Sequence, residues 1–283
     1  MKIAIYGVGA IGSTFALHLA RRGHEVTAIA RNQRLAELQA DKAIVTLKGG
    51  RAPVTVSDKL DPSIEYDLVL VTVLATGVDA IMPALQASRA RAVMFMFNTF
   101  ASIEPLRQAV GAERFSFGFP GIAAFLREGK LESQILERGQ PTSTTDPRWA
   151  RVFTEAGIYT VVERDMQSWL RTHAVVISAI SAATLLARAR HAGISLAEAR
   201  PYALAMHEGF ALVRDSGNAI TPSAIALLQR APVGVASGLL WALSRVKAVR
   251  DFPGVGPAEP RALIDAMVAA APERTRLLKA IRP

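Results

Sequence analysis

A glycine-rich turn near the start of the chain limits what the sequence can fold into more than any other feature. Gly7-Val8-Gly9-Ala10-Ile11-Gly12 follows the apolar run Lys2–Tyr6, which reads as a short strand. Residues 13–22 then carry apolar side chains at helical spacing, and Gly23 ends this pattern. A strand, a tight glycine turn and a helix in this order are typical of a dinucleotide-binding site.

Each glycine of the turn has a separate physical role in such a site. Gly7 permits the tight turn, Gly9 removes a side chain that would block a pyrophosphate, and Gly12 lets helix and strand pack closely. The helix N-terminus adds N–H groups and the positive end of the helix dipole. The alternative is a glycine-rich turn without a ligand. We favour dinucleotide binding because the motif and its context agree.

Strands and helices alternate through the first part of the chain. Strands are predicted at Glu25–Ala30, Asp67–Val73 and Ala92–Phe97, with a helix at Gly77–Ala87 between the last two. This alternation predicts an α/β fold with a Rossmann-type, doubly wound parallel sheet. Further elements are expected at Ile44–Leu47, Val54–Val56, Phe115–Phe119, Leu131–Leu136 and Ile158–Val162 as strands, and at Pro147–Ala156 as a helix.

The chain becomes helical almost throughout after Asp165. We therefore predict a Rossmann domain over residues 1–164 and an all-helical substrate and dimerisation domain over residues 165–283. The helices are expected at Met166–Arg190, Ser195–Ser216, Pro222–Gln229, Gly234–Arg250 and Pro260–Ala271.

Composition excludes several classes of function. The chain has no cysteine, so thiolate catalysis and iron–sulfur clusters are impossible, and no histidine cluster has the spacing of a metal site. Its net charge of +9 is scattered, which argues against nucleic-acid binding, although charge-driven association remains a weaker alternative. The longest apolar stretch, Ala174–Ala187, is shorter than the roughly 20 residues of a membrane span. Glycines interrupt the first apolar run too early for a secretory signal, so we expect a cytoplasmic protein without membrane contact.

The end of the second predicted strand indicates which dinucleotide binds. Arg31 and Asn32 stand where a site selective for NAD would usually place an acidic residue, and they suit a 2′-phosphate. Arg34 is a second candidate for that contact. The sequence therefore predicts NADP(H), against the alternative that Arg31 is an ordinary surface residue.

Two short segments also lie at the C-terminal ends of later strands, at the sheet edge where ligands of such folds bind. They are Thr72-Val73-Leu74 and Asn98-Thr99. Asn98 is placed to hold a ribose, the nicotinamide amide or a substrate carbonyl, and the alternative is an Asx turn.

The chain resembles the ketopantoate reductase (2-dehydropantoate 2-reductase) family over most of its length. The resemblance rests on the order and spacing of Met1-Lys2-Ile3 through Gly12, Arg31, Asp67–Thr72, Asn98, Ser102-Ile103-Glu104, Gly118, Arg127-Glu128-Gly129, Trp169, Glu208–Gly217 and Ile220-Thr221-Pro222. It implies a Rossmann domain and a helical domain with an active site in the cleft between them, where NADPH reduces the ketone of a branched 2-keto acid. The expected cofactor-binding residues are Gly7, Val8, Gly9, Ala10, Ile11, Gly12, Arg31, Asn32, Thr72, Val73, Leu74, Asn98, Thr99 and Ala124.

The catalytic half departs from that family pattern. The resemblance implies a general-acid lysine two residues after Trp169, where this chain has Arg171. Substrate-binding asparagines on the same helix are replaced by Val175 and Ala179, and Glu259 is the best match to a late glutamate. An arginine is a poor proton donor at neutral pH, although it can clamp a carboxylate.

His173 is the nearest alternative proton donor, because an imidazole titrates near neutral pH. Trp169 and His173 share a helix face, whereas Arg171 lies about 200° from each of them at 100° per residue. If the helix starts after Trp169, Arg171 faces the cleft. If it starts earlier, His173 and Trp169 share a face and Arg171 points elsewhere. The catalytic candidates are thus Arg171, His173, Glu259 and Asn98.

Two functions of different classes follow from these residues. The first is an NADPH-dependent oxidoreductase that acts on a small carbonyl or imine substrate other than ketopantoate, an anionic one if Arg171 binds it. The second is a non-catalytic NADP(H)-binding sensor or regulatory protein, because the lysine is missing. We also expect a homodimer, since apolar segments such as Val233–Leu243 suit an interface as well as a core.

Overall fold

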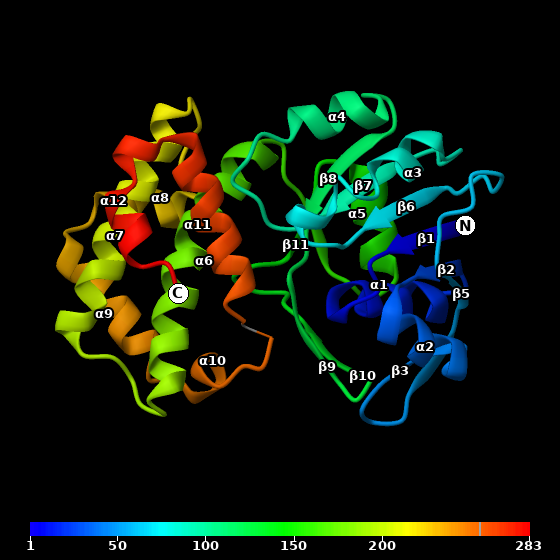
Figure 1. Cartoon of the computed structure of the whole chain (residues 1–283), viewed down its shortest axis with the longest axis horizontal. Helices are drawn as coiled ribbons and strands as arrows, with labels where there is room; N and C mark the ends of the chain where they lie inside the picture. The colour runs from blue at the N-terminus through cyan, green and yellow to red at the C-terminus, as the bar shows by residue number, and fades with distance from the viewer. Residues whose placement is uncertain (255) are drawn as a thin grey trace. The chain divides into compact units, whose positions relative to one another are not determined.

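The computed structural model describes residues 1–254 and 256–283 and divides the chain into two compact units. The first unit comprises Met1–Phe97 and Ile103–Met166, and the second comprises Asn98–Ser102 and Gln167–Pro283. The short segment Asn98–Ser102, which directly follows a strand of the first unit, thus belongs to the second (Figure 1).

The first unit is built on an eight-stranded sheet with the order β12-β11-β8-β7-β6-β1-β2-β5. Every neighbouring pair in it is parallel except β11 and β8, which are antiparallel. The predicted doubly wound α/β fold is therefore confirmed. The strands are β1 (Lys2–Tyr6), β2 (Glu25–Ile29), β5 (Thr55–Ser57), β6 (Leu68–Val71), β7 (Val93–Met96), β8 (Phe115–Phe119), β11 (Thr142–Thr144) and β12 (Thr160–Val162).

Helices and two hairpins complete this unit. The central strands β6 and β7 are buried at every position, as continuous apolar runs predict. Phe15 of α1 and Phe153 of α5 meet edge to face at 5.0 Å in the core. The elements are α1 (Ala10–Arg21), α2 (Asn32–Asp41), α3 (Met82–Ala87), α4 (Glu104–Val110), α5 (Pro147–Glu155), the hairpin β3 (Ala43–Val45) with β4 (Arg51–Pro53), and the hairpin β9 (Ile122–Arg127) with β10 (Lys130–Ile135).

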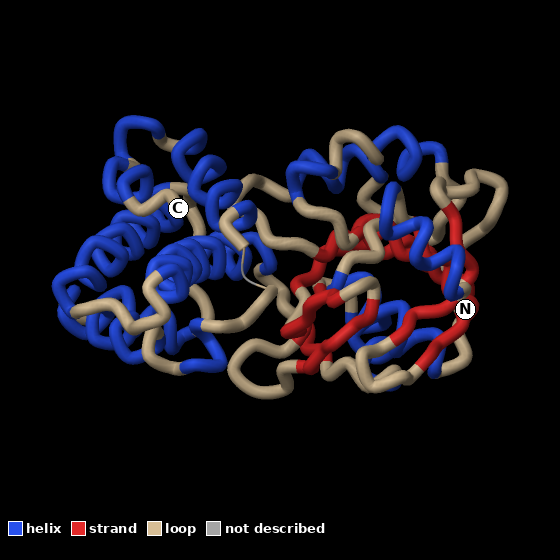
Figure 2. Tube along the Cα trace, turned by 60° about the horizontal axis from the view of Figure 1, so that its bottom comes forward, coloured by secondary structure: helices blue, strands red, loops and turns tan. Residues whose placement is uncertain are grey.

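All described elements of the second unit are helices (Figure 2). Helices α6 and α7 approach closely, because a Cβ at Gly209 would lie 2.6 Å from Val175. Ser195 and Glu198 form a capping box at the start of α7. The elements are α6 (Met166–Ala189), α7 (Leu196–Asp215), α8 (Ser223–Arg230), α9 (Val233–Leu243), α10 (Lys247–Arg250), α11 (Ala258–Ala270), η2 (Pro272–Arg274) and α12 (Arg276–Ala280).

Two predicted helices are wrong in extent. The helix expected at Gly77–Ala87 is a 3-10 turn, η1 (Ala75–Gly77), followed by α3, which starts at Met82 with a proline in its first turn. The helix expected at Gly234–Arg250 is divided into α9 and α10. Ser244 caps α9 there, and its hydroxyl donates to the carbonyl of Trp241 at 2.7 Å. Side chains that bond to nearby backbone in this way end helices.

Helix α6 matches the expected helix Met166–Arg190 to within one residue and extends beyond the apolar stretch Ala174–Ala187. By length and composition it is the one described helix that meets the requirements of a membrane span on its own. Helices α8 and α9 meet them only as a pair bent by 119°. Within the protein, however, 61% of the most apolar window of α6 is buried, and Ala174, Ala179 and Ala187 lie in the core of the second unit. This burial is typical of a core helix.

Candidate functional site

The glycine turn between β1 and α1 has a different steric environment at each glycine. Gly7 has φ +96°, and a Cβ there would lie 2.6 Å from Val73. A Cβ at Gly12 would lie 2.5 Å from both the Gly7 carbonyl oxygen and Thr72 Oγ1. At Gly9, in contrast, no described atom outside Gly9 and its two chain neighbours lies within 4 Å of the position that a Cβ would take.

This geometry fits a bound pyrophosphate. The space at Gly9 is a cradle that any side chain would begin to fill, and the first N–H groups of α1 point out of the helix end beside it. Thr72 Oγ1 donates to the Gly7 carbonyl at 2.7 Å and so fixes the turn against the end of β6. The turn is therefore both preorganised and open.

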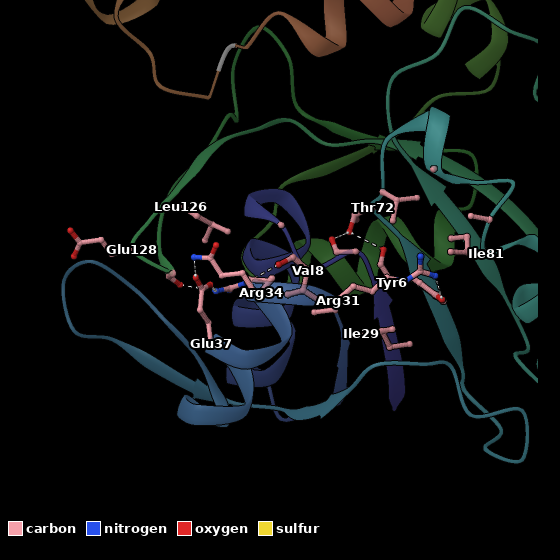
Figure 3. A pocket seen from close by; sticks show the side chains of 18 residues that line it. Tyr6, Val8, Ile29, Arg31, Arg34, Glu37, Thr72, Ile81, Leu126 and Glu128 are labelled. Carbon is pink, nitrogen blue, oxygen red and sulfur yellow. Dashed lines mark hydrogen bonds and ion pairs between the residues drawn. The ribbon is translucent and has the colours of Figure 1, made fainter.

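A cavity of about 720 Å³ adjoins the turn, entirely within the first unit. Six of the expected cofactor-binding residues line it: Gly7, Val8, Gly9, Arg31, Thr72 and Val73. Figure 3 shows side chains from β1, β2, α2 and the β9–β10 hairpin around this space. Eleven further residues line the cavity and were not expected from the sequence: Tyr6, Ile29, Ala30, Gln33, Glu37, Gly77, Ala80, Ile81, Leu126, Glu128 and Gly129.

The two candidate arginines of this cavity differ in availability. Arg31 is exposed at the start of α2 and donates one hydrogen bond, to the Tyr6 hydroxyl at 3.3 Å. The Arg34 side chain is only 15% exposed and donates to four oxygens. These are the carbonyls of Val8 and Gly129, Ser13 Oγ and the Glu37 carboxylate. Arg34 is therefore a brace for the cavity wall, and Arg31 is the arginine free to meet a phosphate.

The remaining expected cofactor residues lie elsewhere. Ala10, Ile11 and Gly12 form the first turn of α1, and Ile11 packs against the core. Asn32 begins α2 with φ 49°. Leu74 is 55% exposed before η1, and Ala124 is buried in the core of the first unit. Asn98 and Thr99 belong to the second unit.

A polar cluster in the second unit brings together three of the four catalytic candidates. Asn98 is 9% exposed, and its Nδ2 donates to Glu259 Oε1 at 3.3 Å. Its Oδ1 lies 3.4 Å from His173 Nδ1. The His173 ring stacks on Trp169 with a centroid distance of 5.0 Å and an interplanar angle of 5°. Because α6 begins at Met166, Trp169 and His173 share one face, which is the second of the two alternatives.

The hydrogen bonds of Asn98 assign the proton on His173. The Asn98 amide group donates to a carboxylate, so its oxygen is the atom directed at His173 and Nδ1 carries the ring proton. Burial lowers the pKa of His173 to about 3, so the ring is neutral at pH 7. Desolvation raises the pKa of Glu259, and the hydrogen bond from Asn98 opposes that rise. Glu259 is exposed as a whole residue, but its Oε1 reaches the buried Asn98.

Arg171, the fourth candidate, lies outside this cluster. Its Nε donates to the Phe100 carbonyl at 3.1 Å, and its NH1 donates to the Ser216 carbonyl and to Asn218 Oδ1. The guanidinium also lies over the Phe100 ring at 5.3 Å. Burial lowers the pKa of Arg171, but a guanidinium keeps its charge at neutral pH. It is held as a hydrogen-bond donor to protein oxygens.

No group of three or more potential metal-ligating side chains occurs among residues 1–254 and 256–283. The polar cluster holds one histidine and one carboxylate, which is too few for a protein metal centre.

A mostly parallel sheet whose first turn carries an open glycine cradle is typical of a Rossmann-type dinucleotide-binding fold, and here a helical unit follows it. Residues 3–141 match the family described as ketopantoate reductase PanE/ApbA. This match covers 139 of the 283 residues and confirms the expected resemblance to the ketopantoate reductase family.

Curated relatives carry the same family name. The chain is 30% identical to the 2-dehydropantoate 2-reductase of Vibrio cholerae serotype O1 over 138 residues. This aligned region covers 48% of this chain and 42% of that protein. It is 26% identical to the 2-dehydropantoate 2-reductase of Aquifex aeolicus over 194 residues. This aligned region covers 64% of this chain and 61% of that protein. The chain thus spans about half the length of the curated relatives that it matches.

Solved structures show the same fold. A PanE/ApbA family ketopantoate reductase from Ralstonia eutropha JMP134 superposes with a TM-score of 0.74 at 21% identity, covering 100% of this chain and 96% of that one. A D-mandelate dehydrogenase in a ternary structure with NADH and anilino(oxo)acetate superposes with a TM-score of 0.69 at 16% identity, covering 100% and 98%.

Proposed function

We propose that the chain is an NADPH-dependent oxidoreductase that transfers a hydride to a small carbonyl or imine substrate other than ketopantoate. The observation that carries this proposal is the open cradle at Gly9 beside a cavity edged by the exposed Arg31. The match of residues 3–141 to a reductase family supports the class of reaction. The curated relatives are 2-dehydropantoate 2-reductases, and they match only part of this chain.

The choice of NADP(H) rests on Arg31. Its guanidinium is exposed at the cavity edge, where a 2′-phosphate would accept bidentate, charge-assisted hydrogen bonds. Glu37 also lines the cavity, but Arg34 and Gln33 both donate to its carboxylate, which leaves it less able to bind a ribose hydroxyl. A preference for NADH over NADPH is the alternative outcome, since the D-mandelate dehydrogenase neighbour was solved with NADH.

The polar cluster of the second unit is the proposed substrate-binding group. Bound NADPH supplies the hydride, and the chain's own residues have to orient the carbonyl. Asn98 lies between a carboxylate and an imidazole, so its buried amide is the polar contact that we propose for the substrate. Val175 and Ala179, where family asparagines are expected, are 0% and 1% exposed in the apolar core and offer no amide. This loss favours a substrate with fewer hydroxyl groups than ketopantoate.

Stopped-flow oxidation of NADPH tests this function directly. The panel contains ketopantoate, unbranched and aryl 2-keto acids, their methyl esters, and imines formed from the same carbonyls. We expect turnover of at least one carbonyl or imine and slow or absent turnover of ketopantoate. Fast turnover of ketopantoate would refute the altered substrate, and turnover of nothing would refute the enzyme assignment.

The second candidate is a non-catalytic NADP(H)-binding protein. Two observations favour it. Arg171, which stands where the general acid is expected, is bonded to protein oxygens, and His173, the alternative proton donor, is neutral at pH 7. Tight NADPH binding together with failure of the whole substrate panel would support this candidate.

A further inference from the structure

Two side chains of α6 hold the backbone of the segment Asn98–Ser102. Arg171 Nε donates to the Phe100 carbonyl, and Gln167 Nε2 donates to the Ala101 carbonyl, both at 3.1 Å. The Phe100 side chain is 1% exposed and lies beneath the Arg171 guanidinium at 5.3 Å. The segment is therefore attached to the helix through successive peptide groups and one buried ring.

The same guanidinium reaches a second stretch of chain. Arg171 NH1 donates to the Ser216 carbonyl at 3.4 Å and to Asn218 Oδ1, and Asn218 Nδ2 in turn donates to Ser168 Oγ at 3.1 Å. All three oxygens that accept from Arg171 belong to neutral groups. The charge of Arg171 is thus used to strengthen hydrogen bonds that join three segments of the second unit.

Asn98 lies two residues before the carbonyl that Arg171 holds. Its bonds to Glu259 and His173 are long, at 3.3 and 3.4 Å. Hydrogen bonds of this length are lost when the donor or acceptor moves by a few tenths of an ångström. The position of the Asn98 backbone therefore decides whether the amide continues to connect the carboxylate with the imidazole.

We propose that Arg171 is a positioning residue, which holds the segment Asn98–Ser102 so that Asn98 keeps His173 in its Nδ1–H form. The proposal rests on the proposed function, in which Asn98 and His173 contact the substrate. It replaces the expectation that Arg171 clamps a substrate carboxylate, because the guanidinium already bonds to Phe100, Ser216 and Asn218.

Nitrogen NMR on protein labelled with ¹⁵N-histidine tests the proposal without turnover. The chain has five histidines, and the signals lost in His173→Gln identify those of His173. At pH 7 the wild type should show one neutral tautomer of His173, protonated on Nδ1. Arg171→Gln should give a mixture of both tautomers, with Nε2–H rising to about a third or more of the population.

Arg188→Gln is the matched control. Arg188 also lies on α6, and its guanidinium also donates to backbone carbonyls, those of Arg250 and Phe252, at 2.9 and 2.7 Å. This variant should leave the His173 signals unchanged. If Arg171→Gln does not fold, Gln167→Ala removes the other tether of the segment and should shift the tautomers in the same direction by a smaller amount.

A single Nδ1–H tautomer in folded Arg171→Gln, or in Gln167→Ala where only that variant folds, would overturn the proposal. Kinetics separate positioning from clamping: positioning predicts that Arg171→Gln lowers kcat about tenfold for a 2-keto acid and for its methyl ester alike. Clamping predicts a rise in KM for the acid alone, which would also overturn it. A wild type without turnover refutes the proposed function instead, and the NMR result still stands.

Discussion

The open space at Gly9 permits a substitution that separates cofactor binding from folding. Gly9 is the N-cap of α1 with φ −73° and ψ −155°, an extended conformation open to other residues. No described atom outside Gly9 and its two chain neighbours lies within 4 Å of its Cβ position. Gly9→Ala should therefore cost folding about 1 kcal/mol or less, the difference between glycine and alanine at an N-cap. In a protein of this size that lowers Tm by roughly 2–4 °C.

Binding should respond much more strongly than folding. The added methyl group occupies the space through which a pyrophosphate approaches the turn, and crowding of this kind costs about 1–3 kcal/mol. This corresponds to a rise in the Kd for NADPH of roughly 5- to 140-fold. Isothermal titration calorimetry measures the Kd, and thermal unfolding measured by circular dichroism gives Tm.

Gly12→Ala is the matched control, because its Cβ would lie 2.5 Å from the Gly7 carbonyl oxygen and Thr72 Oγ1. A backbone oxygen cannot yield easily, so this variant should lose about 1–3 kcal/mol of stability. The reasoning is wrong if folded Gly9→Ala binds NADPH as tightly as the wild type does.

Three further predictions concern stability. Arg34→Met removes four hydrogen bonds from the cavity wall, so the free energy of unfolding should fall by about 2–4 kcal/mol and NADPH should bind more weakly. Urea unfolding and calorimetry measure these two effects, and an unchanged unfolding midpoint would contradict the bracing role. Glu208→Gln weakens the carboxylate cap on the first N–H groups of α12, and Tm should fall by an amount equivalent to about 1 kcal/mol, with Glu273→Gln as an exposed control. The folded pKa of His173, about 3, lies below its unfolded value of 6.5, so its contribution is complete above pH 6.5 and is lost as pH falls toward 3. Between pH 7 and pH 5 this loss is at most about 2 kcal/mol, and His173→Gln should be less acid-sensitive than the wild type by that amount.

The first unit could be predicted largely from local pattern. The boundaries of β1 and β8 coincide with the predicted strands: β1 carries a continuous apolar run, and β8 carries a phenylalanine at every second residue. The hairpin strand β9 was missed although Ile122–Leu126 is a continuous apolar run, and only Ile122 and Ala124 of the strand are buried. Helix α2 was also missed, because only Leu38 of its ten residues is buried.

The site could be predicted as a set of residue types but not as a set of contacts. Periodicity placed Trp169 and His173 on one face, and their rings are stacked as that spacing allows. Arg34 donates a hydrogen bond to the carbonyl of Gly129, 95 residues away, and Arg171 donates one to the carbonyl of Ser216, 45 residues away. Contacts between residues so distant in the sequence follow from tertiary packing, which no local pattern encodes.

Calorimetry with NADPH and NADH tests the central claim, that the glycine turn and Arg31 together recognise a phosphorylated dinucleotide. Charge-assisted hydrogen bonds to a 2′-phosphate contribute about 1.5–3 kcal/mol, so NADPH should bind roughly 10- to 140-fold more tightly than NADH. Arg31→Glu should reverse that order. Equal affinity for the two cofactors, or no heat of binding with either, would contradict the account.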